Sequence, residues 1–340
     1  MLYRSDTIDL CEGEKTSLRT SILRALLYFD LFRHALTFEE IVAASDVPVE
    51  STEDVQRELR ELLFEGVIRT ARGFYWVGAD PTFANLRLVR SSRAADILPE
   101  AMKYVERMAR FPFVRGILIT GSMSHRSMDE RNDVDYLVLT EPGRLWISRS
   151  LLMLYKKIFL HNACAFWCIN YLIDTEHLEI QEKNLFTATE LAAAIPVYGS
   201  ALCKRFLAAN DWLEEYLPNA TPGARTAFIS ERKLQMKKVA ESIFNAPIIR
   251  KITDRLDSAL MRFTEDVWNR KFGTLAPDRF ELQFRTRKYA SKHHPKDYQN
   301  KVLLRLDQRI RAFELEHGQI SGIVEHTHEL EYSQPKGVAA

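Results

Sequence analysis

Two aspartates stand one residue apart, Asp133 and Asp135, directly before the apolar run Tyr136 to Leu139. In a β-strand, residues i and i+2 point to the same face, with Cα atoms about 6.6 Å apart. Carboxylate oxygens are preferred ligands of Mg²⁺, which usually keeps substrate phosphates in its coordination shell as well. Such a pair can also bridge two ions about 3.5–4 Å apart. Asp133 and Asp135 therefore predict a site for Mg²⁺ or Mn²⁺.

Gly121 and Ser122 precede the aspartates and follow a buried-looking apolar stretch, Ile117 to Ile119. Glycine has no Cβ, so the backbone here can approach a ligand closely. The serine adds a hydroxyl and is expected to open a short helix whose free N–H groups favour an anion. Arg126, just past the turn, would add positive charge. These residues predict that a nucleoside triphosphate (NTP) binds beside the metal.

The order of these features resembles the signature of the DNA polymerase β-like nucleotidyltransferase superfamily. The resemblance is carried by Ile119-Thr120-Gly121-Ser122 and Asp133-Val134-Asp135-Tyr136. In that superfamily the Gly-Ser turn contacts the triphosphate and the two aspartates bind metal. The resemblance implies the same roles here, and it implies transfer of a nucleoside monophosphate (NMP) to an acceptor with release of pyrophosphate. Such a motif is a hypothesis about function until its structural context is known.

Active members of this superfamily usually carry a third Asp or Glu on a later strand, which is expected here between Trp167 and Asp174. Alternation with period two puts Cys168, Asn170, Leu172 and Asp174 on one face. We therefore expect Asn170 beside the aspartates as a catalytic residue, although an amide cannot accept a proton and turnover would be slow. Asp174 lies about 13 Å further along an extended strand and is interpreted as a turn residue. It would be the third carboxylate only if this register is wrong.

The composition is that of a globular protein, because 46% of the 340 residues are hydrophobic and 27% are charged, and the length suits two or three domains. The N-terminus has no apolar core of signal-peptide length, and no apolar run approaches the roughly 18 residues of a membrane span. We therefore expect a cytoplasmic protein with no membrane partner. The cysteines lack the paired spacing of a zinc site and are interpreted as reduced thiols. They are Cys11, Cys164, Cys168 and Cys203.

The pattern of elements predicts an α+β fold with an N-terminal winged helix, a small mixed-sheet nucleotidyltransferase core and a C-terminal helical region. The expected domains are a tail at 1–16, the winged helix at 17–78, a connector and helix at 79–110, the core at 111–198, a helical domain at 199–318 and a flexible tail at 319–340. Within them we expect an irregular stretch at 80–88, a third strand at 166–173, and helices at 92–109, 145–160, 201–217, 225–244, 248–272, 280–291 and 298–316, with one more that starts at a capping box, residues 187–190.

Residues 17–77 read as three helices and a hairpin, an order that resembles a winged helix-turn-helix. Its would-be recognition helix at 52–65 carries five acidic residues against Arg57 and Arg60. Affinity for duplex DNA rests mostly on neutralising phosphates, which this helix would repel. DNA binding is therefore not expected, and a docking or scaffold role is favoured.

Positive charge gathers toward the C-terminal part, where residues 225–296 carry 17 Lys and Arg against 8 acids. The densest part, residues 285–296, has five basic residues and no acid. It could clamp a triphosphate or an acidic acceptor, or it could be a solvated helix end. His326 and His328 in the tail could hold a metal but are interpreted as solvated.

The function predicted from these features is Mg²⁺-dependent transfer of an NMP group from an NTP to an unidentified acceptor, either a small molecule, a protein or an RNA. Two alternatives remain open. The core could bind nucleotide without turnover as a regulatory or scaffold subunit, or the chain could be a nucleic-acid-associated factor that uses its basic C-terminal region.

Overall fold

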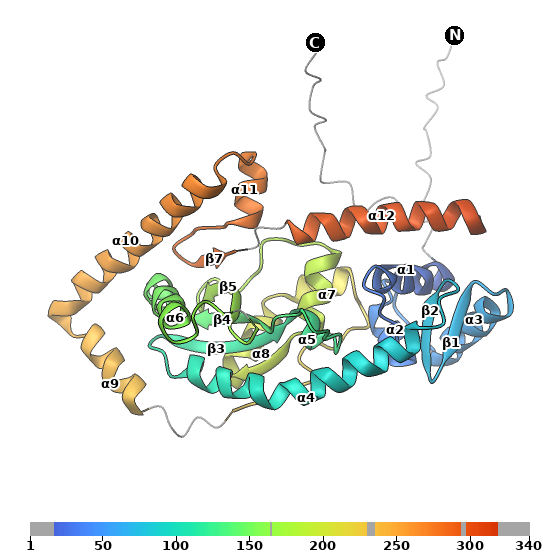
Figure 1. Cartoon of the computed structure of the whole chain (residues 1–340), viewed down its shortest axis with the longest axis horizontal. Helices are drawn as coiled ribbons and strands as arrows, with labels where there is room; N and C mark the ends of the chain where they lie inside the picture. Colours follow the sequence, from blue (N-terminus) through green and yellow to red (C-terminus); the bar gives the residue numbers. More distant parts are fainter. Residues whose placement is uncertain (1–16, 164, 230–234, 294–296, 319–340) are drawn as a thin grey trace, which may run out of the picture.

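The computed structural model describes residues 17–163, 165–229, 235–293 and 297–318. It has a five-stranded mixed sheet flanked by helices, and a two-stranded hairpin near the N-terminus (Figure 1). The α+β class with a small mixed sheet is therefore confirmed. Both predicted tails, Cys11, Cys164 and the two tail histidines lie outside the described residues.

The N-terminal unit, residues 17–77, folds as three helices and a hairpin in the predicted order. The cap expected at Ser51 is present, because its hydroxyl accepts the N–H of Glu53. Arg72 (φ 55°) and Gly73 (φ 78°) both adopt the left-handed backbone that a two-residue type I′ hairpin turn requires. The elements are α1 (Leu18–Asp30), α2 (Phe38–Ala44), α3 (Thr52–Phe64), β1 (Ile68–Ala71) and β2 (Phe74–Val77).

The last described helix, α12 (Tyr298–His317), packs along α1 (Figure 1). Arg309 Nε of α12 donates to Asp30 Oδ2 of α1 at 2.7 Å. The N-terminal unit thus receives part of its core from the far end of the chain. The α12 residues in that core are Val302, Leu306, Ile310 and Phe313.

One helix of 27 residues, α4 (Phe83–Ala109), joins the N-terminal unit to the sheet. The irregular stretch expected at 80–88 is therefore wrong from Phe83 onward. The reason is tertiary, since Phe83 stacks on Trp76 with ring centroids 6.2 Å apart and Arg87 Nε donates to the Ala35 carbonyl at 3.1 Å. These contacts add turns ahead of the apolar pattern from which the helix was expected to start.

The five-stranded sheet has the order β6-β3-β4-β5-β7, and β4 with β5 is its parallel pair. The crossover between these two strands contains the expected long helix, α6 (Leu145–Phe159). Two short strands at the sheet edges, β6 and β7, were not expected from the sequence. The strands are β3 (Val114–Thr120), β4 (Asp135–Thr140), β5 (Cys168–Asp174), β6 (Ile195–Tyr198) and β7 (Ala290–Lys292).

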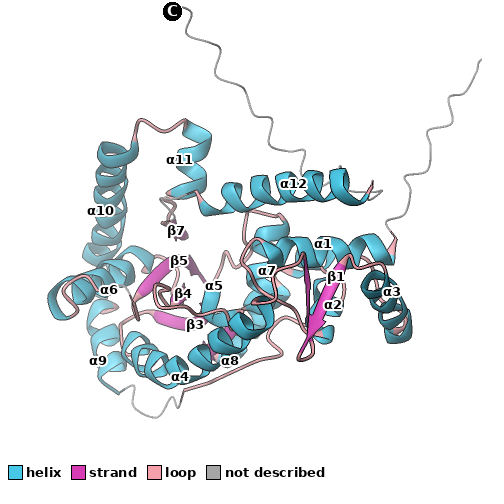
Figure 2. Ribbon diagram, turned by 45° about the vertical axis from the view of Figure 1, so that its right-hand side comes forward, coloured by secondary structure: helices cyan, strands magenta, loops and turns pink. Residues whose placement is uncertain are grey.

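The two faces of the sheet have separate cores, and β4 shows the alternation that produces them. Tyr136 and Val138 pack with residues of α4 and α6, whereas Leu137 and Leu139 pack with residues of helices on the other face. Figure 2 draws the ribbon of the sheet among these helices. Asp135 starts β4 in phase with Leu137. Its side chain therefore belongs to the face that carries α7 (Leu185–Ala193), α8 (Ser200–Ala208) and the 3-10 helix η1 (Asp211–Glu215).

The region 199–318 was expected to be helical throughout, and this is wrong because β7 completes the sheet at Ala290–Lys292. The helix expected at 225–244 is absent from residues 225–229 and is described from Gln235 onward. The N–H groups of Ala227 and Ile229 instead donate to the β6 carbonyls of Pro196 and Val197. The expected 201–217 helix is divided into α8 and η1. The other helices are α9 (Gln235–Phe244), α10 (Pro247–Phe272) and α11 (Pro277–Gln283).

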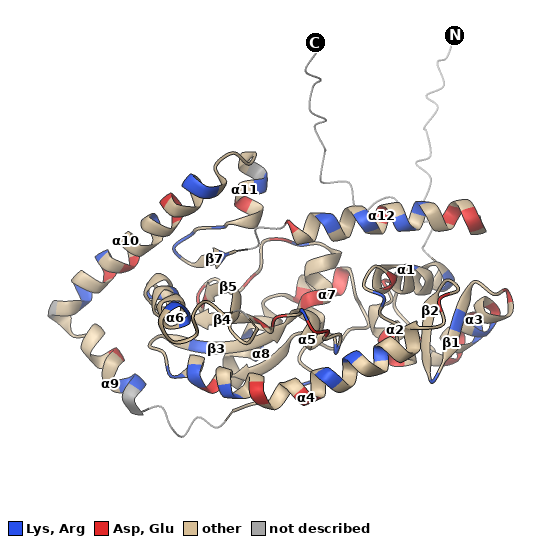
Figure 3. Ribbon diagram, viewed as in Figure 1, with Lys and Arg blue, Asp and Glu red and all other residues tan. Residues whose placement is uncertain are grey.

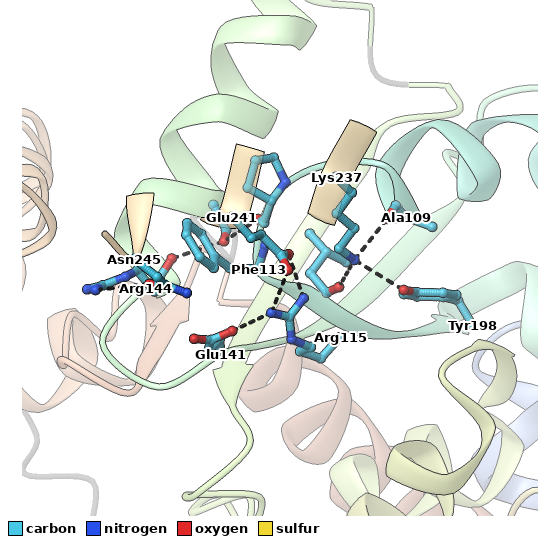
Figure 4. Close-up of polar contacts among 12 residues, drawn as sticks. Ala109, Phe113, Arg115, Glu141, Arg144, Tyr198, Lys237, Glu241 and Asn245 are labelled. Atoms are coloured by element: carbon cyan, nitrogen blue, oxygen red, sulfur yellow. Dashed lines mark hydrogen bonds and ion pairs between the residues drawn. The ribbon is translucent and has the colours of Figure 1, made fainter. Parts of the chain in front are cut away.

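Helix α9 is attached to the start of β3 by buried and partly buried charges (Figure 4). Lys237 Nζ donates to the carbonyl of Ala109 at 3.0 Å and to the hydroxyl of Tyr198 at 3.1 Å. Glu241 accepts the N–H of Phe113 at 2.7 Å and pairs with the Arg115 guanidinium at 2.7 Å. Hydrogen bonds to charged groups are stronger than those between neutral groups. These contacts therefore hold α9 against β3, although the outer face of α9 mixes polar and apolar residues.

Candidate functional site

The register of the sheet brings the Gly-Ser turn and the aspartates together. Thr120 at the end of β3 pairs with Asp135 at the start of β4, and Gly121 follows with φ 67°. A Cβ on Gly121 would lie 2.5 Å from Asp135 Oδ2. Glycine is therefore favoured here, both for its backbone angle and because any Cβ would displace the Asp135 carboxylate.

Asp135 is held in an environment that opposes its negative charge. Burial raises the pKa of its carboxyl to about 7, and the negative charges of Glu190 and Asp133 add to this effect. Hydrogen bonds from Cys168 and Asn170 act in the opposite direction. Asp133 lies before β4 and is partly buried. The site is thus a cluster of carboxylates with unfavourable mutual repulsion, which a divalent cation would relieve.

The expected contact of Asn170 with Asp135 is present, because its Nδ2 donates to Asp135 Oδ1 at 2.5 Å, whereas no contact with Asp133 is seen among the described residues. The expected alternation along β5 is wrong beyond this residue. The β4–β5 register shifts between Tyr136 and Leu137, which makes Asn170 the extra residue of a bulge. Leu172 consequently packs in the core on the opposite face, with Tyr136. Simple period-two counting cannot reveal a bulge.

Asp174 does not belong to the site, since it pairs with Thr140 at the far end of β4. Its Oδ1 accepts the N–H groups of Glu176 and His177, each at 3.0 Å. The same oxygen lies 2.8 Å from His177 Nδ1. Asp174 is therefore the strand-end turn residue that the sequence indicated.

Glu190 of α7 is the site residue that sequence reasoning missed. Its Oε2 accepts the N–H of Gly121 at 2.9 Å, and its Oε1 lies 3.2 Å from His125 Nε2. The sequence pattern at 187–190 had suggested a local capping box, and this is wrong. The cap is Asn184, whose side chain accepts the N–H of Thr187 at 3.0 Å. Glu190 instead contacts the Gly-Ser turn.

The remaining predicted nucleotide ligands lie around α5 (Gly121–Ser124). The hydroxyl of Ser122 is hydrogen-bonded to the side-chain amide of Asn132. When the amide oxygen accepts from this hydroxyl, the amide nitrogen of Asn132 donates to Asp129 Oδ2 at 3.1 Å. Arg126 is exposed, and its carbonyl accepts from Arg87 at 3.0 Å. Burial and then the charge of Arg126 lower the pKa of the Arg225 guanidinium, which shows that positive charge gathers at this turn.

The basic segment that begins at Arg285 is neither a solvated helix end nor a free clamp over its described part. It leads into β7, and three of its basic residues make ion pairs. Arg285 and Lys292 both pair with the buried carboxylate of Glu182, at 3.0 and 2.7 Å. Arg287 pairs with Glu281 at 2.8 Å. These pairs fix β7 to the sheet, so the clamp hypothesis loses most of its donors.

Helix α3 carries acidic residues together with Arg57 and Arg60 (Figure 3). Arg57 pairs with Asp54 at 2.7 Å, within the same helix. Arg19 of α1 pairs with Glu65 at the α3 end. No surplus of positive charge develops on α3, which is consistent with a docking surface. The absence of DNA binding stays a prediction.

The donor set suits Mg²⁺ only together with a nucleotide. Asp133 and Asp135 supply hard oxygen ligands, which are the kind this ion requires. Among the described residues, however, no group of three or more His, Cys, Asp or Glu is arranged to hold a metal ion. Cys168 and Cys203 are free thiols whose pKa values are raised to about 12, chiefly by burial. Phosphate oxygens would therefore have to complete the coordination.

Asn170→Asp should strengthen metal binding and weaken the metal-free fold. The new carboxylate would stand where the amide now donates to Asp135, so two like charges would meet unless a cation separates them. With Mn²⁺ present it would add a third oxygen ligand, and we expect about tenfold tighter Mn²⁺ binding by calorimetry. The melting temperature in chelator should fall. Asn269→Asp on exposed α10 is the control, and unchanged Mn²⁺ affinity in Asn170→Asp would contradict the geometry.

Within the described residues no helix is both long and apolar enough to span a membrane. The glycine turn, the carboxylates and the amide of the candidate site lie at one end of the three inner strands, β3, β4 and β5. The chain matches no protein-family model, no curated protein and no solved structure.

Proposed function

We propose that the protein transfers an NMP group from an NTP to an acceptor in a Mg²⁺-dependent reaction. The observation that carries this proposal is the pairing of Thr120 with Asp135, which sets the Gly121 turn directly against a repelling carboxylate cluster. A cation and a polyphosphate would satisfy this cluster and this turn together. A solvated surface turn would not need a glycine packed this closely against a partly buried aspartate.

The residues would divide the work as follows. Asp133 and Asp135 would hold the ion, which when bound supplies charge neutralisation at the α-phosphate. The N–H of Gly121, the hydroxyl of Ser122 and the guanidinium of Arg126 would position the β- and γ-phosphates. An acceptor oxygen would form the new bond to the α-phosphorus, the bond to the β-phosphate oxygen would break, and pyrophosphate would leave. Positioning and electrostatics provide most of the rate in such reactions.

Incubation with each α-labelled NTP, Mg²⁺ and a metabolite extract tests the activity. We expect label to appear in a new product together with an equal amount of pyrophosphate. Asp133→Asn should abolish both signals. Asp174→Asn is the matched control and should leave them unchanged, because that carboxylate lies at the far end of β4. Transfer that survives in Asp133→Asn, or that is lost in Asp174→Asn, would place the chemistry elsewhere.

A second candidate function is nucleotide binding without turnover, in a regulatory or scaffold protein. Two observations favour it: the third polar position is the amide of Asn170, and the Gly121 N–H already has an internal partner in Glu190. The same incubation separates the candidates. Saturable NTP binding without pyrophosphate release would support this second function.

A further inference from the structure

Arg87 of α4 is almost completely buried, with 2% of its surface exposed. A guanidinium carries five N–H donors in a rigid planar fork, so burying one is costly unless acceptors surround it. Some of these acceptors belong to the N-terminal unit. Nε donates to the Ala35 carbonyl at 3.1 Å, and Nη2 donates to the carboxylate of Glu40 on α2. One side of the fork is therefore bound to the N-terminal unit.

The other terminal nitrogen of Arg87 holds the turn that follows α5. Nη1 donates to the carbonyl of Arg126 at 3.0 Å and to that of His125 at 3.5 Å. It also donates to the Ser91 hydroxyl of α4 at 2.7 Å, and this hydroxyl in turn donates to the Arg126 carbonyl at 3.3 Å. A single rigid group thus connects the N-terminal unit to the segment directly after the Gly-Ser turn.

Arg126 has a backbone conformation that needs such support. Its φ of 52° is in the left-handed region, which is unfavourable for a residue with a Cβ. This conformation reverses the chain, so that the N–H of Arg126 donates to the Met123 carbonyl at 3.1 Å and the N–H of Ser127 donates to the Ser122 carbonyl at 2.8 Å. The backbone around Ser122 therefore depends on a strained residue whose carbonyl Arg87 holds.

The N-terminal unit reaches the same segment at a second point. The ring of Phe29 on α1 meets that of His125 edge-on, with centroids 5.9 Å apart. His125 Nε2 lies 3.2 Å from Glu190 Oε1, and the other oxygen of Glu190 accepts the N–H of Gly121. Both contacts lead from the N-terminal unit to residues of the candidate site.

We propose that Arg87 is a positioning residue, which holds segment 121–127 in the shape that binds a triphosphate and makes that shape depend on the packing of the N-terminal unit. The triphosphate in this statement rests on the proposed function, whereas the control of the segment's conformation does not. Arginine is needed because a lysine ammonium is a single point charge and cannot donate to Ala35, Glu40 and the turn together. Because coupling is reciprocal, bound nucleotide should also stabilise α2.

Hydrogen exchange of backbone N–H groups tests the positioning role without nucleotide. In Arg87→Lys the N–H groups of Arg126 and Ser127 should exchange at least about tenfold faster, relative to that of Leu137 in β4, than in wild type. A general loss of stability would accelerate exchange at all three positions, so the ratio separates positioning from a merely structural role. An unchanged ratio would overturn the role of Arg87.

Glu40→Gln breaks the link from its other end and leaves Arg87 in place. Glu40 uses both oxygens, because Oε2 accepts the N–H of Thr37 at 3.0 Å in the capping box of α2 and Oε1 accepts from Arg87. Glutamine has one oxygen, which can serve the cap or Arg87 but not both. We expect the same faster exchange at Arg126 as in Arg87→Lys, with no further increase in the double variant.

The matched control is Glu39→Gln, which removes the same charge from an exposed position of α2. Its exchange at Arg126 should equal that of wild type. Additive effects in the double variant of Glu40 and Arg87 would show that the two residues act separately, and would overturn the dependence on the N-terminal unit.

Equilibrium binding of a non-hydrolysable NTP with Mg²⁺ tests the consequence for the site. Arg87→Lys and Glu40→Gln should each weaken binding about tenfold, and Glu39→Gln should bind as wild type. Bound nucleotide should slow exchange at the N–H of Ile41, which donates to the Thr37 carbonyl of α2 at 3.0 Å, in wild type but not in Arg87→Lys.

The two kinds of measurement separate this inference from the proposed function. Equal nucleotide affinity in all variants, together with fast exchange at Arg126 in Arg87→Lys, would overturn the effect on nucleotide and support the control of the segment. Wild-type protein that bound no nucleotide would overturn the proposed function. The exchange ratios would then still decide whether Arg87 positions segment 121–127.

Discussion

Asp135→Asn is expected to abolish transfer and to stabilise the protein at pH 8. Loss of a metal-binding carboxylate should reduce turnover by on the order of 10³. The gain in stability follows from the pKa of Asp135, which is raised from 3.8 to about 7, mainly by burial. Asparagine keeps an oxygen that can accept from Asn170 but has no charge to bury. The carboxylate proposed to bind metal is therefore one that the fold would be more stable without.

The pH dependence gives the sign of this effect. Below about pH 4 the carboxyl is protonated in both the folded and the unfolded chain, so the variant and wild type should melt alike. Between pH 4 and 7 the unfolded chain ionises first, and wild-type stability falls by a few kcal/mol, a cost that stays constant above pH 7. Thermal unfolding at pH 4 and pH 8 measures it, and we expect Asp135→Asn to melt roughly 5 °C higher at pH 8.

The control for this experiment is Asp307→Asn, which removes a partly exposed carboxylate paired with Arg311 on α12. It should show no comparable gain, because exposed ion pairs contribute little either way. The interpretation would be contradicted if Asp135→Asn were destabilised at pH 8, or if its gain in stability did not depend on pH. Either result would show that the fold does not disfavour the ionised carboxylate of Asp135.

Glu190→Gln should tighten NTP binding about tenfold. In the structure the Glu190 carboxylate accepts the N–H of Gly121, which is the donor a triphosphate would need. An incoming polyphosphate must displace it and then tolerate its charge. Like charges about 10 Å apart at an effective dielectric constant of about 20 repel by roughly 1.5 kcal/mol, which corresponds to a factor of about ten in affinity.

Equilibrium binding of a non-hydrolysable NTP with Mg²⁺ measures this effect. Glu179→Gln provides the comparison, since it removes a solvent-exposed acid that pairs with Lys183 in the loop before α7. Its affinity should match that of wild type. If Glu190→Gln bound nucleotide more weakly, the glutamate would be a ligand of the metal-nucleotide complex and not its competitor.

The local features of the fold could be predicted from sequence because they depend on neighbouring residues. The cap at Ser51, the turn at Arg72-Gly73 and the crossover helix α6 all have short-range causes. Asn170 could be placed beside Asp135 because the alternation holds from the start of β5 up to that residue. The pair Gly121 and Asp135 follows from two adjacent strands joined by a polar turn.

What could not be predicted depends on contacts between distant residues. Strand β7 has three residues and exists because Lys292 and Arg285 meet Glu182, more than a hundred positions earlier. The first turns of α4 exist because Arg87 is buried against the N-terminal unit. Glu190 carried a pattern that a local cap explains equally well. In each case the deciding partner leaves no mark in the surrounding sequence.

The packing of α12 on α1 has a consequence for how the chain is made. Asp30 and Arg309 are bonded across 279 positions, and four apolar residues of α12 complete the core around α1. Chains emerge from the ribosome at about 5–20 residues per second, so α1 waits tens of seconds for this partner. Contacts of such long range also close slowly. We therefore expect the first unit to be synthesised to be the last to finish folding. Until α12 packs against it, chaperones can bind its exposed apolar surface.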